Sequence, residues 1–383
     1  MSGIHLFVPM LHRRDAVGEH TRSLRDRLVE EGVECRIYID MPDPDTVGET
    51  RPYRDYEADA RPGDVLVYQM ATRSEMATWL RGRPEPVVIN YHSITPAQFF
   101  VPWNNWIARH QVAATQDMAA LAPTAALGIG VSEFDAEELR RAGCPDVTVI
   151  PVANVQVPPP PPDPEALAAL ERAPGGPHWL SVGRLAPNKG HEDTLAALFV
   201  ARATSAPDAR LTIVGAASEP AYARALHRYT AALGLSGAVT FASRLSDAEL
   251  SAQYAAADVL VMLSAHEGFG VPLLEAMSHG VPVVAFASGA VPEIVDGAGV
   301  LLYERGPRRV ADAVATLLDD PDRCAALVAA GRARPSALGL DRAASDLVTA
   351  LRRVAEGADN SPAGPRSAVV GDGPLRPPAP LTN

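Results

Sequence analysis

Short apolar runs alternate with segments of helical periodicity along nearly the whole chain, and this alternation limits the folds that the chain can adopt. The runs at 4–8 and 259–263 are apolar or nearly so throughout, as in strands that are buried on both faces. Segment 18–31 instead carries apolar residues at helical spacing. A repeated strand–helix series predicts parallel sheets covered by helices, and therefore the α/β class.

A proline-rich stretch divides this series into two halves. Residues 158–162 are five consecutive prolines, which favour an extended and stiff connector. We therefore expect two Rossmann-like domains with parallel sheets, joined by a connector that contains a short helix. The expected segments are an N-terminal domain at 1–152, the connector at 153–177 with its helix at 164–172, a second domain at 178–340, a last helix at 341–356 and a disordered Pro-, Gly- and Ala-rich tail at 357–383. Within the first domain, residues 40–62 are expected to form a loop.

Charge and cysteine content exclude several classes of protein. The 383 residues include 34 Lys and Arg against 46 Asp and Glu, so the net charge is 34 − 46 = −12, and sequence-independent binding of nucleic acid is not expected. The three cysteines form no disulfide or metal-binding pattern. No apolar run approaches the ~20 residues that span a bilayer. The first apolar run has no basic segment before it and reads as a strand rather than a signal peptide, so we expect a cytoplasmic protein.

Two glutamates in the second half mark the main candidate site. Glu267 and Glu275 have seven residues between them, and a buried strand precedes them while a helix begins near Pro272. Glu267 is expected in the loop at the carboxyl end of that strand, and Glu275 in the first turn of the helix. In parallel sheets ligands bind at this edge, where helix N-termini attract anions and a carboxylate can accept hydrogen bonds from a vicinal diol. A ligand that is part anion and part polyhydroxyl, such as a nucleotide sugar, fits both features.

Three further segments carry residues suited to such a ligand. Arg184 and Lys189 lie between a strand and a helix, where an Arg fork and a Lys point charge can hold phosphate. His92 follows the strand at 86–90 and therefore lies at the ligand-binding edge of the first sheet. Gly289 and Ala290 could offer backbone N–H groups to phosphate.

The start of the helix expected at 103–121 is rich in aromatic residues. The preferred interpretation is packing of this helix onto the N-terminal domain. The alternative is an acceptor-side surface that faces lipid. The residues concerned are Phe99, Phe100, Trp103 and Trp106.

The stretch from Glu267 to Glu275, with Gly-Phe-Gly-Val-Pro-Leu-Leu between, resembles the double-glutamate motif of family 4 retaining glycosyltransferases (glycosyl transferases group 1). Residues 183–190, with the pattern Gly-Arg-Leu-x-x-x-Lys-Gly, resemble the diphosphate clamp of the same family. The match is strong over residues 178–300 and weak in the N-terminal half. It implies the GT-B architecture, in which two Rossmann-like domains face each other across a cleft and the last helix packs back on the first domain.

The resemblance also implies roles for individual residues. His92 would orient the donor sugar, Glu267 would hold its hydroxyls, and Arg184 and Lys189 would stabilise the leaving diphosphate. Glu275 would accept hydrogen bonds from the ribose. The residues expected to bind the donor are Gly18, Gly183, Arg184, Lys189, Glu267, Gly268, Phe269, Gly270, Val271 and Glu275. No metal or other cofactor is implied.

The expected reaction is retaining transfer of a sugar from a UDP- or GDP-linked donor to a hydroxyl. The acceptor would be a saccharide, a lipid-linked molecule or a small molecule, in glycan, glycolipid or cell-envelope polysaccharide synthesis, and the enzyme could contact the inner face of the membrane. Many family members have a Gly-Gly pair in the first loop, where this chain has Ala16-Val17-Gly18-Glu19-His20, which leaves the acceptor and phosphate contacts of that loop open.

Three alternatives belong to other functional classes. The chain could be a nucleotide-sugar epimerase of the same fold, or a non-catalytic partner that only binds a nucleotide sugar. A nicotinamide-dependent oxidoreductase would need Gly-x-Gly-x-x-Gly after the first strand, and Gly18 stands alone there.

Overall fold

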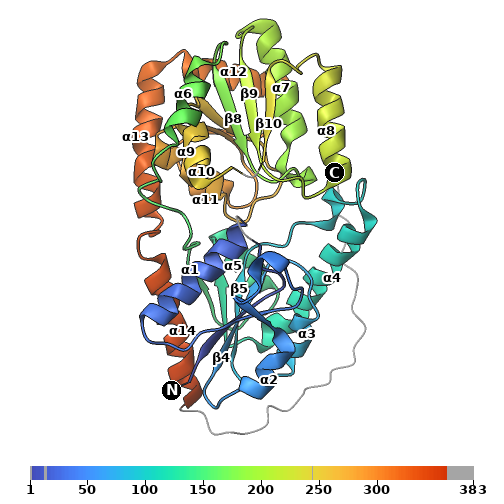
Figure 1. Cartoon of the computed structure of the whole chain (residues 1–383), viewed down its shortest axis with the longest axis vertical. Helices are drawn as coiled ribbons and strands as arrows, with labels where there is room; N and C mark the ends of the chain where they lie inside the picture. The colour runs from blue at the N-terminus through green and yellow to red at the C-terminus, as the bar shows by residue number, and fades with distance from the viewer. Residues whose placement is uncertain (1, 13–14, 244, 360–383) are drawn as a thin grey trace.

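The computed structural model describes residues 2–12, 15–243 and 245–359, which form two lobes stacked along the long axis of the molecule (Figure 1). A seven-stranded parallel sheet in the order β3-β2-β1-β4-β5-β6-β7 forms the centre of the N-terminal lobe. Its strands are β1 Ile4–Val8, β2 Ile37–Ile39, β3 Thr50–Pro52, β4 Val65–Met70, β5 Val87–Tyr91, β6 Leu127–Gly130 and β7 Val147–Val149.

Helices cover both faces of this sheet, as its apolar central strands require. Every residue of β1, β4 and β5 is buried, so neither face of these strands can be exposed to water. Side chains cap the helix starts: Asp15, Asn104 and Ser132 accept hydrogen bonds from backbone N–H groups of the first turn. The helices are α1 Ala16–Glu30, α2 Tyr56–Asp59, α3 Met76–Arg81, α4 Asn105–Leu121 and α5 Glu133–Arg141.

The C-terminal lobe repeats the plan with a six-stranded parallel sheet in the order β10-β9-β8-β11-β12-β13. Its strands are β8 His178–Val182, β9 Arg210–Val214, β10 Val239–Ala242, β11 Val259–Met262, β12 Val283–Phe286 and β13 Val300–Leu302. Its helices are α6 Pro164–Arg172, α7 His191–Thr204, α8 Pro220–Ala232, α9 Asp247–Ala255, α10 Val271–His279, α11 Val291–Val295, α12 Pro307–Leu318 and α13 Pro321–Ala337.

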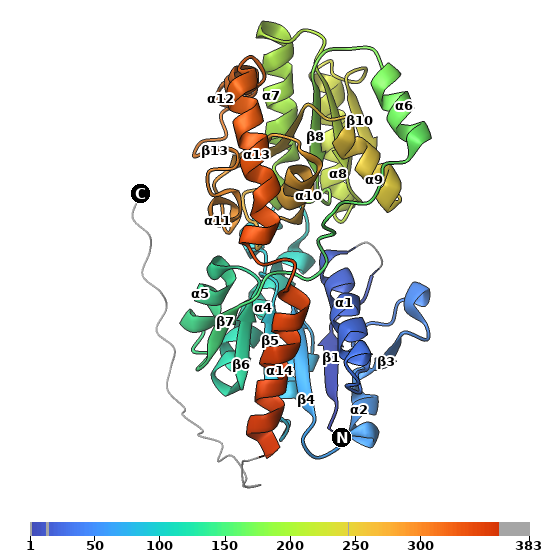
Figure 2. The same cartoon turned by 90° about the vertical axis from the view of Figure 1, so that its left-hand side faces the viewer.

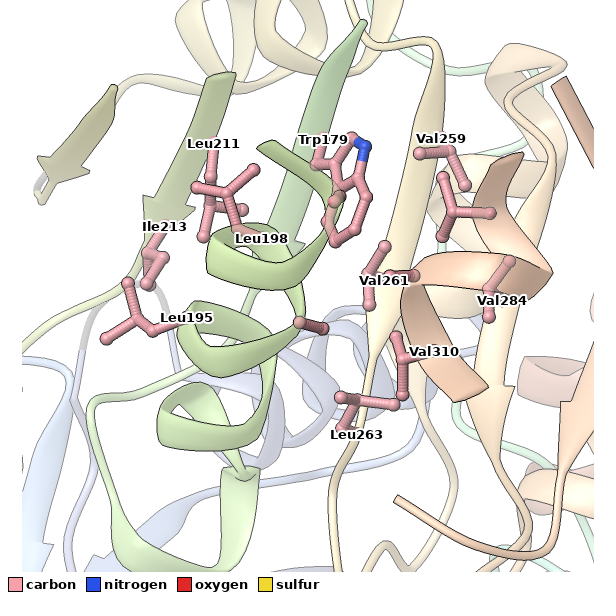
Figure 3. Close-up of a cluster of buried hydrophobic side chains, with 14 of the residues drawn as sticks. Trp179, Leu195, Leu198, Leu211, Ile213, Val259, Val261, Leu263, Val284 and Val310 are labelled. Atoms are coloured by element: carbon pink, nitrogen blue, oxygen red, sulfur yellow. The ribbon is translucent and has the colours of Figure 1, made fainter. Parts of the chain in front are cut away.

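A continuous apolar core joins α7 and α12 to one face of the second sheet (Figure 3). Trp179 of β8 is 1% exposed and shares this core with Leu198 of α7 and Val310 of α12. Full burial of each such side chain is favourable by about 1.5–3 kcal/mol. The core holds the sheet rigid, and therefore fixes where the loops at its carboxyl edge begin.

The chain returns to the N-terminal lobe at its end. Helix α14, Ala343–Asp359, follows α13 down the side of the molecule (Figure 2). Its Leu347 and Leu351 are fully buried in the same apolar cluster as Leu24 and Leu28 of α1. The last helix is therefore part of the first lobe's core.

Three details differ from the sequence-based expectations. Residues 40–62, expected as a loop, contain the edge strand β3 and the short helix α2; β3 is largely exposed and lacks the apolar pattern of a buried strand. Glu275 lies in the second turn of α10, because this helix begins at Val271, earlier than expected. The tail expected at 357–383 begins as the last residues of α14, and from residue 360 it lies outside the described residues.

Among the described residues, every helix is too short or too polar to cross a membrane.

Candidate functional site

Most of the predicted residues of the second lobe lie on two segments that follow neighbouring central strands, and Val271 and Glu275 lie in the helix α10 that comes after the second segment. After β8 the chain runs to one side of the sheet, through β9 and β10, and then crosses back to β11 on the other side of β8. The loops that follow β8 and β11 therefore diverge at a topological switch point, where α/β sheets form ligand-binding crevices. The first loop carries Arg184 and Lys189, and the second carries Glu267.

Lys189 and Glu267 form a close ion pair in this structure. The Lys189 Nζ donates to both carboxylate oxygens of Glu267, at 2.9 and 2.7 Å, and the two side chains are only 16% and 9% exposed. The structure thus brings together two residues for which the sequence predicted separate contacts, with diphosphate and with sugar hydroxyls. Lys189 fixes the orientation of the Glu267 carboxylate and balances its charge.

A second loop supports the backbone of Glu267. The Ala290 N–H donates to the Glu267 carbonyl oxygen at 2.9 Å, so this amide is already bonded rather than free for phosphate. Gly289 has φ +52°, and a Cβ there would lie 2.1 Å from the same oxygen. Glycine at 289 is therefore required for the close approach of the two loops.

Arg184 is an exposed cation at the same edge. No carboxylate forms an ion pair with its guanidinium anywhere in the described part of the chain. Its carbonyl oxygen lies 3.1 Å from Nε2 of His191, a fully buried imidazole whose pKa is lowered to about 4 by burial. Gly183 lies next to the stem of Lys189, since a Cβ there would be 3.5 Å from the Lys189 Cδ. Arg184 therefore has a fixed backbone and a free charged head.

Glu275 is held by a residue of α9 rather than by another predicted site residue. The Tyr254 hydroxyl donates to Glu275 Oε2 at 2.7 Å. Burial raises the pKa of the Glu275 carboxyl, and the hydrogen bond from Tyr254 partly offsets this rise.

His92 of the first lobe belongs to a buried polar cluster. Its Nε2 lies 2.7 Å from Gln69 Oε1, and its ring meets that of His20 edge to face at 4.9 Å between centroids. Burial, and then the nearby His20, hold the pKa of His92 well below its ordinary value. His20 is also neutral at pH 7, because burial lowers its pKa to about 4, and its ring nitrogens contact the Asn90 amide at 2.8 Å and the Ala153 N–H at 3.1 Å. His92 is thus a rigid, uncharged imidazole.

Gly18 lies in the first turn of α1. Its N–H donates to the Asp15 carboxylate at 3.2 Å, so a negative charge caps this helix. A Cβ at Gly18 would lie 2.4 Å from the His12 carbonyl oxygen. This close contact alone explains why residue 18 is a glycine, whether or not a ligand binds there. Binding of phosphate here would compete with Asp15.

Residues beside His92 and Glu267 join the two lobes. Ser93, with φ +62°, places its Oγ 3.0 Å from Nε2 of His266. Gly268 lies against the first lobe, since a Cβ there would be 2.4 Å from the Ser93 Cβ and 3.2 Å from Oδ2 of Asp135. Asp135 is fully buried and its oxygens have no hydrogen-bond partner among the described residues. Burial, and then the neighbouring Glu138, hold the pKa of Asp135 well above its ordinary value.

Sequence reasoning missed several of these residues. Ser93 follows His92 and His266 precedes Glu267, and this position next to a predicted residue was the only sequence feature that pointed to either of them. His20, Asp135 and Tyr254 lie on helices without a recognisable motif, so only tertiary packing reveals them.

The helix α4 packs onto the N-terminal domain as expected, through Ala114, Met118 and Leu121. Trp103 does not follow this expectation: it contacts Tyr222 of α8 edge to face at 5.1 Å and packs against the core of the second lobe. The Asn104 Nδ2 donates to Glu219 at 3.0 Å beside it. Trp106 is 65% exposed, and its ring lies against the His110 ring with 33° between the ring planes.

Within residues 2–12, 15–243 and 245–359 there is no cluster of three or more His, Cys, Asp or Glu side chains that could hold a metal ion.

The architecture defines the class of protein: two facing α/β lobes of the GT-B type. Sucrose-phosphate synthase from Thermosynechococcus elongatus superposes with a TM-score of 0.75 at 22% identity, over 93% of this chain and 100% of that chain. HepE from Anabaena, solved with UDP-glucose, superposes with a TM-score of 0.70 at 20% identity. The match covers 94% of this chain and 100% of that chain. At these identities the likeness concerns the fold alone.

Residues 163–334 match the family model "Glycosyl transferases group 1". The GDP-mannose-dependent alpha-(1-6)-phosphatidylinositol monomannoside mannosyltransferase of Mycobacterium tuberculosis is 38% identical over 182 residues, which are 44% of this chain and 46% of that protein. The D-inositol 3-phosphate glycosyltransferase of Segniliparus rotundus is 35% identical over 185 residues, which are 47% of this chain and 41% of that protein. The chain thus matches less than half the length of these curated relatives.

Proposed function

We propose that this protein is a retaining, metal-independent glycosyltransferase that moves a sugar from a nucleoside diphosphate sugar to an acceptor hydroxyl. The observation that carries the proposal is the convergence of Arg184, Lys189 and Glu267 at the switch point of the second sheet, with His92 beside the Ser93 loop that contacts it. Cations and a carboxylate at such an edge suit a ligand with both phosphate and hydroxyl groups.

Catalysis in this proposal is electrostatic. As the glycosidic bond to the leaving diphosphate breaks, negative charge grows on the phosphate oxygens, and the free guanidinium of Arg184 lies at the same edge to stabilise it. Lys189 would share its donors between Glu267 and the phosphate, while Glu267 holds hydroxyls of the sugar. The neutral His92 would orient the donor sugar without adding charge beside it.

GDP-mannose is the donor that we favour. The mycobacterial relative, at 38% identity, is named as GDP-mannose-dependent. The structural neighbour that was solved with UDP-glucose is only 20% identical, so the likeness to it concerns the fold and gives no support for a uridine base.

We further propose a lipid-linked acceptor at the inner face of the membrane in the cytoplasm, in glycolipid or cell-envelope synthesis. Relatives are named for transfer to a phosphatidylinositol mannoside and to inositol phosphate. In the first half of α4, Trp106 and Val112 are 65% and 50% exposed, and Arg109 between them in the sequence is exposed as well. Aromatic and basic side chains favour the lipid–water interface. Cosedimentation with phosphatidylinositol vesicles should fall in Trp106→Ser, and equal sedimentation of both proteins would contradict this contact.

A thermal-shift screen tests the donor site. GDP, UDP, ADP and dTDP would each be added with and without Mg²⁺, because a ligand that binds only the folded protein raises the melting temperature. We expect the largest shift with GDP, equal in both metal conditions and lost in Arg184→Ala. Arg309→Ala is the matched control, because this arginine is 62% exposed and pairs with Glu304 at 3.1 Å on the surface.

A transfer assay separates the enzyme from a silent binding partner. If GDP binds but no sugar moves from GDP-mannose to a phosphatidylinositol mannoside or an inositol phosphate, the result supports a non-catalytic protein that only binds the nucleotide sugar. Unchanged transfer in Glu267→Gln would contradict the role assigned to that carboxylate. The nucleotide-sugar epimerase alternative predicts conversion of the sugar nucleotide without any acceptor.

A further inference from the structure

Tyr254 is one of the largest fully buried side chains of the second lobe and its hydroxyl is directed at a predicted site residue. The residue is 1% exposed, and its hydroxyl lies 2.7 Å from Glu275 Oε2 and 3.5 Å from the Pro272 carbonyl oxygen. A buried tyrosine hydroxyl needs a hydrogen-bond partner, and a charged acceptor makes the stronger bond. The Tyr254 hydroxyl therefore holds one defined oxygen of Glu275.

The same tyrosine supports the backbone of Glu275 through His279. The Tyr254 ring stacks on the His279 ring at 4.9 Å and 21°, and His279 Nδ1 lies 2.7 Å from the Glu275 carbonyl oxygen. On its other side, His279 Nε2 lies 2.9 Å from Ser251 Oγ, which donates to the Pro160 carbonyl oxygen of the connector. The side chain and the backbone of Glu275 are thus both braced from α9.

The other carboxylate oxygen of Glu275 is left for a ligand. No hydrogen bond to Oε1 occurs among the described residues, and this atom is not one of the fully enclosed polar atoms without partners. A glutamate side chain has three rotatable bonds, so fixing Oε2 in advance removes an entropic cost that a ligand would otherwise meet. One oxygen is anchored and the other has no hydrogen bond among the described residues.

We propose that Tyr254 is the positioning residue of Glu275: by holding Oε2 it presents the carboxylate to the paired hydroxyls of a ribose. This inference rests on the proposed function, because it takes the ligand to be a ribonucleoside diphosphate. Tyr254 itself acts through Glu275 and touches no reacting atom.

Loss of the Tyr254 hydroxyl should change the pH dependence of nucleotide binding. Burial raises the pKa of Glu275, the Tyr254 hydrogen bond lowers it, and Asp247, on α9, raises it. Tyr254 and Asp247 act on Glu275 from α9, and His279 contacts its backbone from α10. Without the tyrosine hydroxyl the pKa of Glu275 rises further, so the carboxylate becomes protonated at a higher pH. A protonated carboxyl has lost charge and acceptor capacity, so ribose binding should weaken at a higher pH than in the unmodified protein.

The test is calorimetric binding of GDP and 2′-deoxy-GDP, and of UDP and 2′-deoxy-UDP, from pH 5.5 to 8. The unmodified protein should bind the ribonucleotide about tenfold more tightly than its deoxy form, the effect of one hydrogen bond to a charged group. In Tyr254→Phe we expect this ratio to fall below about threefold, and the pH at which affinity declines to move upward. Tyr229→Phe, at a 38% exposed tyrosine of α8, is the control. It should change neither the affinity ratio nor the pH at which affinity declines.

The possible outcomes separate the positioning role of Tyr254 from the ribose role of Glu275. If Tyr254→Phe keeps both the ratio and the pH profile while the unmodified protein discriminates, the positioning role is overturned and the proposed function stands. If the unmodified protein binds ribose and deoxyribose forms equally, the ribose role of Glu275 fails and the positioning role with it. Absence of binding by all four nucleotides overturns the proposed function as well.

A double variant guards against a merely structural effect. Glu275→Gln should lose the ribose preference at every pH in this range. Adding Tyr254→Phe to Glu275→Gln should then change the ratio no further, because the two residues act through one carboxylate. An additional loss in the double variant would show that Tyr254 acts by another route.

Discussion

At the residue scale, the main feature of the site is the pairing of Lys189 with Glu267. Both side chains are largely buried, and each charge is compensated mainly by the other. Desolvation of such a pair is costly, so its net contribution to stability is small, whereas an unpaired member is strongly unfavourable. The pair therefore places two opposite charges at this edge of the sheet with little net gain in stability.

A double-mutant cycle should show this coupling. Lys189→Met leaves the Glu267 carboxylate without its partner, and we expect the free energy of unfolding to fall by about 1–3 kcal/mol. Glu267→Gln leaves Lys189 unpaired and should cost a similar amount. The double variant should be more stable than the sum of the two losses predicts, as measured by urea denaturation. Additive losses would show that the two residues act independently.

At the scale of elements, a helix of one lobe is capped by a side chain of the other. The Glu293 carboxylate of α11 accepts from the backbone N–H groups of Glu133 and Phe134, at 3.1 and 3.3 Å. These N–H groups belong to the first turn of α5, where a negative charge is favourable. The contact ties the α11 segment, next to the Glu267 loop, to the N-terminal lobe.

Removal of this cap should loosen α5 locally. In Glu293→Ala the first-turn amides of α5 lose their acceptor, at a cost of about 0.5–2 kcal/mol by analogy with an N-cap. Hydrogen exchange of residues 133–135 should become faster, while exchange in β8 should not change. Glu304→Ala, at an exposed surface glutamate of the same lobe, is the control. Unaltered exchange in α5 would mean that its own Ser132 cap is sufficient.

Most elements were predictable from the sequence because their determinants are local. The helix at 164–172 begins after Asp163 with a proline in its first turn, and the structure has it at Pro164–Arg172. The edge strand β3 was not predicted, because its own residues lack a strand pattern. Its extended conformation depends on pairing with β2, in which Thr50 lies opposite Ile37.

At the scale of the whole molecule, the two lobes contact each other through residues next to the candidate site. Gly268 does not have a left-handed backbone, so its need for glycine comes from the approach of Ser93 and Asp135 of the other lobe. The contact of Trp103 with Tyr222 and the return of α14 to the first lobe tie the lobes at other points. The relative placement of the lobes thus decides which residues of each half meet.

A single methyl group should test this placement. In Gly268→Ala the Cβ would lie 2.4 Å from the Ser93 Cβ, so the lobes must separate or the loop must move. We expect a larger radius of gyration in small-angle scattering and at least a tenfold loss of sugar transfer. Gly237→Ala is the control, since a Cβ there meets nothing within 4 Å. Normal scattering and normal transfer in Gly268→Ala would show that the contact is dispensable.

The sequence by itself determined the α/β class, the order of nearly all strands and helices, and the positions of Glu267, Arg184, Lys189 and His92 at strand ends. These properties follow from hydrophobic periodicity, turn residues and short motifs, all of which act over a few neighbouring positions. Only the tertiary structure decided that Lys189 binds Glu267, that Tyr254 holds Glu275, and that Ser93 and Asp135 lie against Gly268. Those contacts join residues that are 21 to 175 positions apart, and their existence depends on the packing of helices and lobes, for which no local pattern carries a signal.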